Sequence, residues 1–110
     1  MEKDRDQLIT RVNKLDKLVN YQDGSIVSRA IIDKKSGTLT LFAFWQGQAL
    51  SEHTAPFDAL VFIVDGEAEV TISGKAHRVK TGEIIILPAN EPHALKAVTN
   101  FKMLLVMIRA

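Results

Sequence analysis

After residue 24 the pattern of hydrophobic and polar residues changes to that of short β-strands. The segment Glu67–Ile72 alternates strictly, which is typical of a strand with one buried and one solvated face. Turns that carry glycine recur at intervals of roughly eight to twelve residues. We therefore expect strands at residues 26–32, 38–45, 59–64, 68–72, 77–79, 84–87, 93–98 and 101–108. Short strands without long helices between them predict an all-β fold, an antiparallel sandwich or a closed jelly roll.

Three of the expected strands depart from this alternation. Residues 60–64, 84–87 and 103–108 are almost continuously apolar, so both faces of these strands need cover. A barrel interior covers only one face, and exposed apolar patches of this extent are unusual in monomers. We therefore expect a homodimer in which one sheet of each barrel packs against its partner.

The first part of the chain has a different period. Between residues 4 and 20 the apolar positions are Leu8, Ile9, Val12, Leu15, Leu18 and Val19. These offsets are typical of one face of a packing helix, and Asp23-Gly24 marks a turn after it. We expect an N-terminal helix and linker over residues 1–24, followed by a single barrel domain over residues 25–110.

Composition and charge exclude several classes of function. The chain has 110 residues, a formal net charge of +1 and no cysteine. One domain is expected at this length, and disulfides, thiolate metal sites and a thiol nucleophile are excluded. The small charge indicates neither a nucleic-acid nor a membrane partner. No signal peptide or membrane-length apolar run is visible, so a cytoplasmic location is expected.

Two motifs anchored by glycine and proline coincide with the expected strands and turns. The first contains Gly47, His53, Ala55, Ala59 and Gly66, and the second contains Gly82, Pro88, Asn90, His93 and Ala97. Their order and spacing resemble the two sequence motifs of the cupin superfamily, over residues 26–108 of this chain. The resemblance implies a jelly-roll barrel, also called a double-stranded β-helix, and together with the N-terminal pattern we expect such a barrel preceded by a short α-helix.

The same resemblance suggests a metal site that has lost ligands. In cupins the histidines and glutamate of the first motif and the histidine of the second bind a divalent transition metal. Only His53 and His93 occupy such positions here, because Ala55 and Ala59 replace a histidine and the glutamate, and Ala97 replaces an asparagine. Since losing even an outer partner weakens metal binding by about 10–100-fold, we expect weak or absent metal binding.

The alanines also predict an open space inside the barrel. Small apolar side chains at former ligand positions would leave an apolar pocket with the two histidines at its polar end, a mixture typical of small-molecule sites. The residues expected to line it are His53, Ala55, Ala59, Val61, His93, Leu95 and Ala97.

Three functions remain open at this point. The first is a protein that binds a small molecule in the apolar pocket. The second is a metal-dependent cupin enzyme, a dioxygenase or isomerase, that uses His53 and His93 with an unforeseen third ligand. The third is a structural dimer module whose barrel is filled by neighbouring aromatic and methionine side chains. The sequence assigns no catalytic residue and names no ligand.

Overall fold

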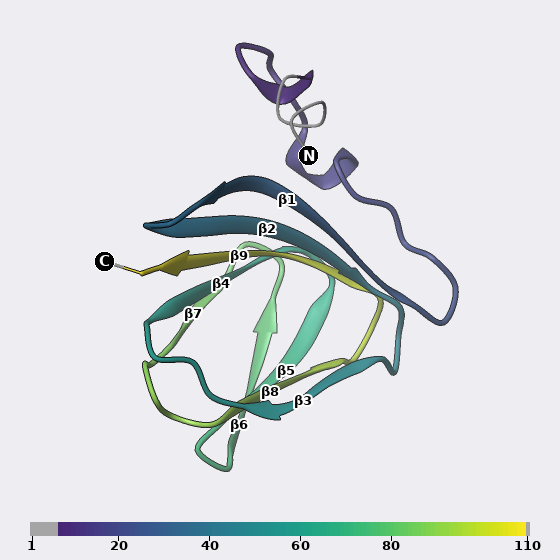
Figure 1. The fold of residues 1–110 in the computed structure, drawn as a ribbon. Helices are drawn as coiled ribbons and strands as arrows, with labels where there is room; N and C mark the ends of the chain where they lie inside the picture. Colours follow the sequence, from purple (N-terminus) through teal and green to yellow (C-terminus); the bar gives the residue numbers. More distant parts are fainter. Residues whose placement is uncertain (1–6, 110) are drawn as a thin grey trace.

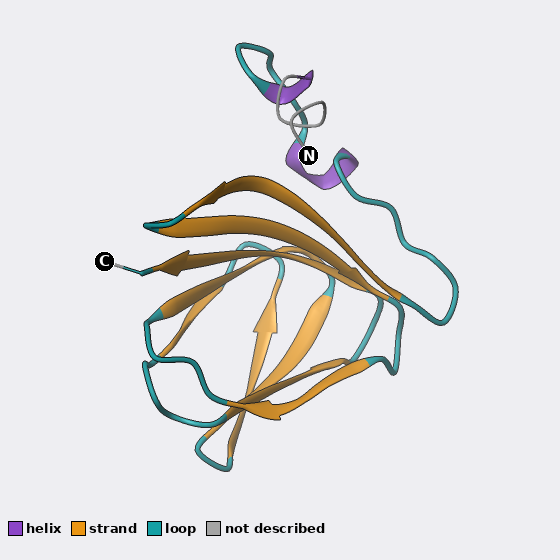
Figure 2. Ribbon diagram, viewed as in Figure 1, coloured by secondary structure: helices purple, strands orange, loops and turns teal. Residues whose placement is uncertain are grey.

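Nine strands make up the barrel in this computed structural model, which describes residues 7–109 of the chain (Figures 1 and 2). They are β1 (Ile26–Lys34), β2 (Gly37–Phe44), β3 (Ala49–His53), β4 (Ala59–Asp65), β5 (Glu67–Ile72), β6 (Lys75–Lys80), β7 (Ile84–Leu87), β8 (His93–Ala97) and β9 (Phe101–Ile108). The all-β prediction is confirmed, and eight of these strands coincide with expected ones. The sequence pattern does not predict β3, because four of its five side chains are exposed and no apolar alternation marks it.

The strands form two antiparallel sheets. The five-stranded sheet has the order β1-β2-β9-β4-β7, and the four-stranded sheet has the order β3-β8-β5-β6. Figure 1 shows the two sheets facing each other as the walls of a barrel, with neighbouring strands often distant in sequence. This arrangement is the expected jelly roll, and it brings β3 and β8 side by side.

One end of the barrel is closed by a packed core. The rings of Phe44 and Phe101 stack with their centroids 4.4 Å apart. Val61, Ile63 and Val70 pack in the same cluster, and all five side chains have no exposed surface. Each such burial stabilises the fold by roughly 1.5–3 kcal/mol. The interior near this end is therefore filled by side chains.

The Asp65-Gly66 turn, which looks like a hairpin signal in the sequence, instead joins the two sheets. It links β4 of one sheet to β5 of the other, whereas Ser73-Gly74 forms a true hairpin between β5 and β6. Gly66 has a φ of +89°, and a Cβ there would collide with the Asn100 carbonyl oxygen. Only glycine meets both constraints without strain.

The expected N-terminal helix is wrong for the described residues. Within residues 7–20 the backbone is helical only at residues 7–8 and in a single 3-10 turn, η1 (Leu15–Lys17). Thr10 adopts a positive φ of 56°, which interrupts an α-helix, and the Val12 side chain is fully exposed. The apolar positions therefore do not form one buried stripe. Residues 4–6, where the helix was expected to begin, lie outside the described residues.

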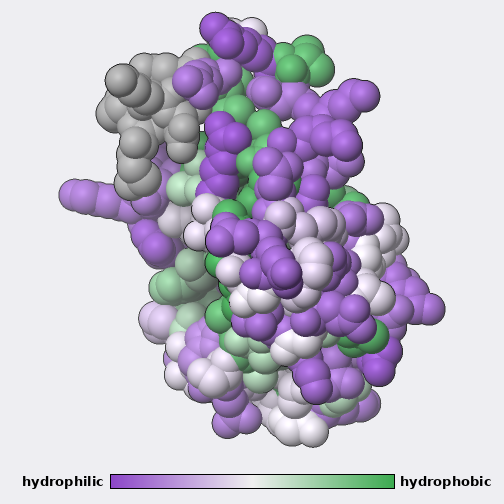
Figure 3. All heavy atoms as spheres, turned by 90° about the vertical axis from the view of Figure 1, so that its right-hand side faces the viewer, coloured by the Kyte–Doolittle hydropathy of each residue, from purple (hydrophilic) through white to green (hydrophobic). Residues whose placement is uncertain are grey.

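The N-terminal segment nevertheless covers part of the five-stranded sheet. Val19 is buried against Leu41 and Ala43 on the face of the sheet that points away from the barrel interior. Figure 3 shows hydrophobic atoms gathered where this segment meets the barrel. The packing role expected of a helix is thus filled by a largely irregular segment.

Polar contacts fix this segment in place. The Lys102 Nζ donates a hydrogen bond of 2.6 Å to the Asp16 carbonyl oxygen and lies 4.8 Å from the centre of the Tyr21 ring. The Tyr21 hydroxyl donates to a carboxylate oxygen of Asp65 at 2.6 Å. Burial and the Asp65 carboxylate both raise the pKa of Tyr21 above its usual value.

In the described part of the chain no helix has the length and apolar character needed to span a bilayer.

Candidate functional site

A cavity of about 430 Å³ lies inside the barrel at the end opposite the packed core. Among the described residues, fourteen line it, and only His53, Thr54 and His93 of these are polar. The walls come from both sheets and from the loop between β3 and β4. The apolar lining residues are Phe42, Leu50, Ala55, Pro56, Phe57, Ala59, Leu87, Leu95, Met103, Leu105 and Met107.

Five of the seven residues predicted to line a pocket do so. His53, Ala55, Ala59, His93 and Leu95 all contribute to the cavity wall. They come from β3, the loop after it, β4 and β8, which converge at this end of the barrel.

Val61 and Ala97 are not among the cavity-lining residues. They do point inward, as strand parity predicts, but they belong to the packed core, with 0% and 2% of their surface exposed. Each lies further along its strand toward the closed end of the barrel. Strand parity gives the face on which a side chain lies, but it does not give the depth at which packing closes the interior.

The five-stranded sheet supplies lining residues that the sequence motifs do not mark. Ala59 on β4 has Leu87 on β7 and Met107 on β9 as its cross-strand partners, and both of these line the cavity. Met103 and Leu105 lie on the same face of β9 as Met107, and both also line the cavity. Finding them requires the pairing of β9 between β2 and β4, which alternation along a single strand does not reveal.

The two histidines meet at the polar end of the cavity. His53 and His93 are cross-strand partners on the neighbouring strands β3 and β8, not on facing sheets. Their Nε2 atoms are 3.2 Å apart, and the rings meet edge to face with centroids separated by 4.4 Å. Burial, and to a lesser extent the neighbouring His53, lower the pKa of His93, while the Glu91 carbonyl oxygen opposes this effect. The neutral imidazole is therefore the favoured form of His93 at neutral pH.

Backbone carbonyl groups set the tautomer of both rings. The His53 Nδ1 lies 2.8 Å from the Ser51 carbonyl oxygen, and the His93 Nδ1 lies 3.2 Å from the Glu91 carbonyl oxygen. A carbonyl oxygen only accepts hydrogen bonds, so each Nδ1 carries the proton and donates. In the neutral rings both Nε2 atoms are consequently bare acceptors.

These residues do not fit a divalent metal held by three or four protein ligands. Two imidazole nitrogens bound to one ion at about 2.0–2.1 Å would lie roughly 3.4 Å apart, close to the separation of the His53 and His93 Nε2 atoms. However, residues 7–109 contain no group of three or more histidine, cysteine or acidic side chains suited to a metal ion. Asp58, the carboxylate nearest in sequence to the missing glutamate, is exposed and accepts a hydrogen bond from the Ala89 N–H at 2.8 Å.

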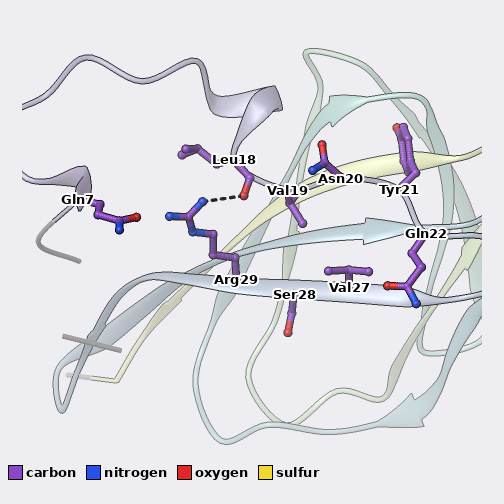
Figure 4. A pocket seen from close by; sticks show the side chains of 9 residues that line it. All are labelled: Gln7, Leu18, Val19, Asn20, Tyr21, Gln22, Val27, Ser28 and Arg29. Atoms are coloured by element: carbon purple, nitrogen blue, oxygen red, sulfur yellow. Dashed lines mark hydrogen bonds between the residues drawn. The ribbon is translucent and has the colours of Figure 1, made fainter. Parts of the chain in front are cut away.

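A second hollow, of about 590 Å³, lies between the N-terminal segment and β1 (Figure 4). Its most polar wall is Arg29, whose Nη1 donates to the Leu18 carbonyl oxygen at 3.1 Å. Gln7, Asn20 and Gln22 add amide groups around it. Because the guanidinium already holds the N-terminal segment, we interpret this hollow as part of the attachment of that segment to the sheet.

Comparison with known proteins agrees with the geometry. The sequence profile of the cupin domain, Cupin_2, matches residues 40–109, which is more than half of the chain. The chain belongs to the cupin family. No significant match was found among functionally curated proteins.

Solved structures resemble this cupin closely. A conserved protein of unknown function from Streptococcus pyogenes is 37% identical, with a TM-score of 0.88 over 92% of this chain and 89% of that one. A cupin 2 conserved barrel domain protein from Leptotrichia buccalis is 45% identical, with a TM-score of 0.84 over 86% of this chain, which spans 46% of that protein. A cupin superfamily protein from Desulfitobacterium hafniense is 26% identical, with a TM-score of 0.86 over 90% of this chain and 91% of that one.

Proposed function

We propose that this cupin domain binds a small, largely apolar molecule inside its barrel. The observation that carries the proposal is the cavity of about 430 Å³ with apolar walls and a pair of imidazole rings at one end, of which His93 is buried and His53 is exposed. Small-molecule sites commonly occupy about 300–1,000 Å³ and combine apolar walls with a few directing polar groups. The cavity has the size, the lining and the polar end of such a site.

The open space follows from the substitutions in the two motifs. Ala55 and Ala59 stand where the cupin motifs carry histidine and glutamate, so two large polar side chains are replaced by methyl groups. The neighbouring Phe42, Met103 and Met107 line the cavity and leave about 430 Å³ between them. This geometry favours ligand binding over a filled structural barrel.

Methionine methyl groups offer a direct test. Two of the three methionines, Met103 and Met107, line the cavity. In protein labelled with ¹³C at the methionine methyl groups, titration with toluene and with 4-ethylphenol should shift both of these signals. Saturable shifts support the proposal, and unchanged signals at millimolar probe would overturn it.

A plugging variant locates the binding in the barrel. Ala55 is in the loop at the edge of the cavity, and Ala55→Trp should fill the entrance and abolish the methyl shifts. Ala76→Trp places the same side chain on an exposed position of β6 and should leave the shifts intact. Equal binding by both variants would place the probe outside the barrel and refute the proposal.

We also propose that a second copy of the chain covers the outer face of the five-stranded sheet. Two rows of cross-strand partners run across that face: Leu39–Val106–Leu60–Ile86 and Leu41–Leu104–Phe62–Ile84. We call these eight residues the outer apolar face.

The exposed part of the outer apolar face and its lack of charge favour a second copy of the chain as the partner that covers it. Leu41 is already fully buried beneath the N-terminal segment, which also packs near Leu104, but Ile84 and Ile86 at the β7 edge remain 56% exposed. A two-fold dimer places the same patch on itself, and an uncharged patch meets no like charge when it does so. Such a pairing would bury the strands that lack alternation.

Light scattering coupled to gel filtration tests the dimer. The protein should elute at twice the chain mass at micromolar concentration, and Ile86→Lys should shift it toward the monomer. Ala76→Lys, on the exposed part of β6, serves as the matched control and should remain dimeric. A monomeric parent protein would rule the dimer out.

A further inference from the structure

The imidazole rings of His53 and His93 at the polar end of the cavity face each other through their Nε2 atoms. Three polar contacts involve the pair: Nδ1 of His53 with the Ser51 oxygen, Nδ1 of His93 with the Glu91 oxygen, and Nε2 with Nε2. Each contact needs one proton, but two neutral imidazoles carry only two. With both protons held by the carbonyl contacts, two lone pairs face each other across 3.2 Å.

The alternative tautomer does not remove the conflict. If His53 carried its proton on Nε2, its bare Nδ1 would face the Ser51 carbonyl oxygen at 2.8 Å. An acceptor would then oppose an acceptor at a closer distance than the two Nε2 atoms have now. The same change in His93 would place a bare Nδ1 3.2 Å from the Glu91 carbonyl oxygen, so it only moves the conflict to that contact. The conflict is resolved when a third proton, supplied from outside the pair, enters between the Nε2 atoms.

We propose that the ligand of this cavity carries one hydrogen-bond donor, an O–H or N–H group on an apolar body, which the Nε2 atoms of His53 and His93 accept. This inference rests on the proposed ligand-binding function and adds the chemical class of the ligand. A phenol, an alcohol or an N–H heterocycle has this character, whereas an ether or a hydrocarbon of the same shape does not.

The rest of the cavity wall agrees with this class. Thr54, the third polar lining residue, is exposed at the loop after β3, so it adds no buried polar partner deep in the cavity. Among the described lining residues there is no lysine, arginine, aspartate or glutamate. A phosphate, a dicarboxylate or a sugar would lose its hydration here without gaining charged or multiple polar partners. A single donor on an apolar body matches both the wall and the polar end.

Matched probes test the donor requirement. We choose 4-ethylphenol, its methyl ether 4-ethylanisole, and 4-ethyltoluene, which share an apolar body and differ in the donor. Isothermal titration at pH 7.5 should give about tenfold tighter binding of the phenol than of the ether, the upper range for one hydrogen bond. In His53→Phe, which keeps an aromatic ring but removes one Nε2, this preference should fall to about threefold or less.

The third histidine provides the control. His77 lies on β6 and is not among the cavity-lining residues, so His77→Phe should keep the full preference for the phenol. His93→Phe should also reduce the preference, and it supplies a second variant if His53→Phe folds poorly.

An NMR measurement separates the donor inference from the binding function. Two-bond ¹H–¹⁵N correlation spectra at pH 7.5 should show a protonated Nδ1 and a bare Nε2 on both His53 and His93, and the bare Nε2 signals should shift when 4-ethylphenol binds. A bare Nδ1 on either ring, or a pair that already holds a third proton without ligand, overturns the donor inference.

The outcomes of the titrations are also distinct. If 4-ethylanisole and 4-ethyltoluene bind as tightly as 4-ethylphenol, the cavity binds ligands but the donor inference is wrong. If none of the three probes binds at millimolar concentration, the ligand-binding function itself fails, and the donor inference fails with it.

Discussion

Ala59→Leu and Ala97→Leu are the same substitution at two inward positions, and the structure predicts opposite effects on stability. The cupin motifs carry a larger polar residue at both positions, the ligand glutamate in place of Ala59 and an asparagine in place of Ala97. Both alanines belong to the same buried cluster, with 6% and 2% of their surface exposed, but only Ala59 also lines the cavity. The pair therefore tests whether the interior is open at one end and closed at the other.

The magnitudes follow from what each new side chain meets. Leucine adds three carbon atoms to alanine, so burial in the open cavity stabilises by at most about 2.4 kcal/mol, at about 0.8 kcal/mol for each carbon. Ordering the side chain costs about 0.5–1 kcal/mol, which leaves a net gain of roughly 1–2 kcal/mol for Ala59→Leu. The same atoms at Ala97 overpack the core and should cost about 1–3 kcal/mol. The variants should thus differ by about 2–5 kcal/mol.

Urea unfolding measures this difference directly. Trp45 is the only tryptophan, so its fluorescence reports one site, and circular dichroism checks that both probes agree. Ala59→Leu should raise the unfolding midpoint and weaken the binding of 4-ethylphenol. If Ala59→Leu loses as much stability as Ala97→Leu, the cavity is filled or collapsed in solution and the reasoning from its walls is refuted.

Three further predictions concern other parts of the molecule. Tyr21 is the only tyrosine, and its absorbance should show ionisation well above the usual pKa of 10.0, with a lower pKa in Asp65→Asn. Because the pKa of Tyr21 is raised in the folded protein, the stability that Tyr21 contributes is complete below about pH 10 and falls as the pH rises further. Titration at the normal value in the native protein would contradict the Tyr21–Asp65 contact. Gly66→Ala should destabilise the fold by at least about 1–3 kcal/mol in thermal unfolding, because of its positive φ and the close Asn100 carbonyl group, and an unchanged melting temperature would contradict the tight corner. Elemental analysis after incubation with iron, manganese, nickel, zinc or copper and desalting should find no stoichiometric metal, and one equivalent lost in His93→Ala would show that a further ligand completes the site.

Much of the fold could be predicted because its determinants are local in sequence. The bounds of β7 and β9 agree with the strands expected at residues 84–87 and 101–108, because apolar runs of this length between turn residues favour strands whatever their partners are. The turn at Ser73-Gly74 also follows from local chemistry, because both residues adopt positive φ in the hairpin. Asn90 likewise adopts a positive φ of 66°, which asparagine tolerates better than most residues.

The errors arise where distant contacts decide the structure. The strand β3 carries little apolar pattern, and its pairing with β8 determines it. The helical period before residue 20 does not produce a packing α-helix: Val19 is buried against Leu41, whereas Ile9 and Val12 remain exposed. Asp65-Gly66 has the composition of a hairpin, yet the strands on either side belong to different sheets.

The candidate site was predictable in part for the same reason. The convergence of His53 and His93 follows from the motifs, but their contact as neighbours on β3 and β8 depends on sheet order. The tautomers of the two rings depend on the Ser51 and Glu91 carbonyl oxygens, and no sequence pattern encodes those contacts. The depth at which the core closes, which separates Ala59 from Ala97, is a property of the packed barrel.

A crystal structure of the protein soaked with 4-ethylphenol tests the central claim most directly. We predict one probe molecule inside the barrel, with its ring against Leu87 and Met103 and its hydroxyl group within hydrogen-bonding distance of the Nε2 atoms of His53 and His93. A barrel closed by Met103 and Met107, with no probe inside it, would contradict the account.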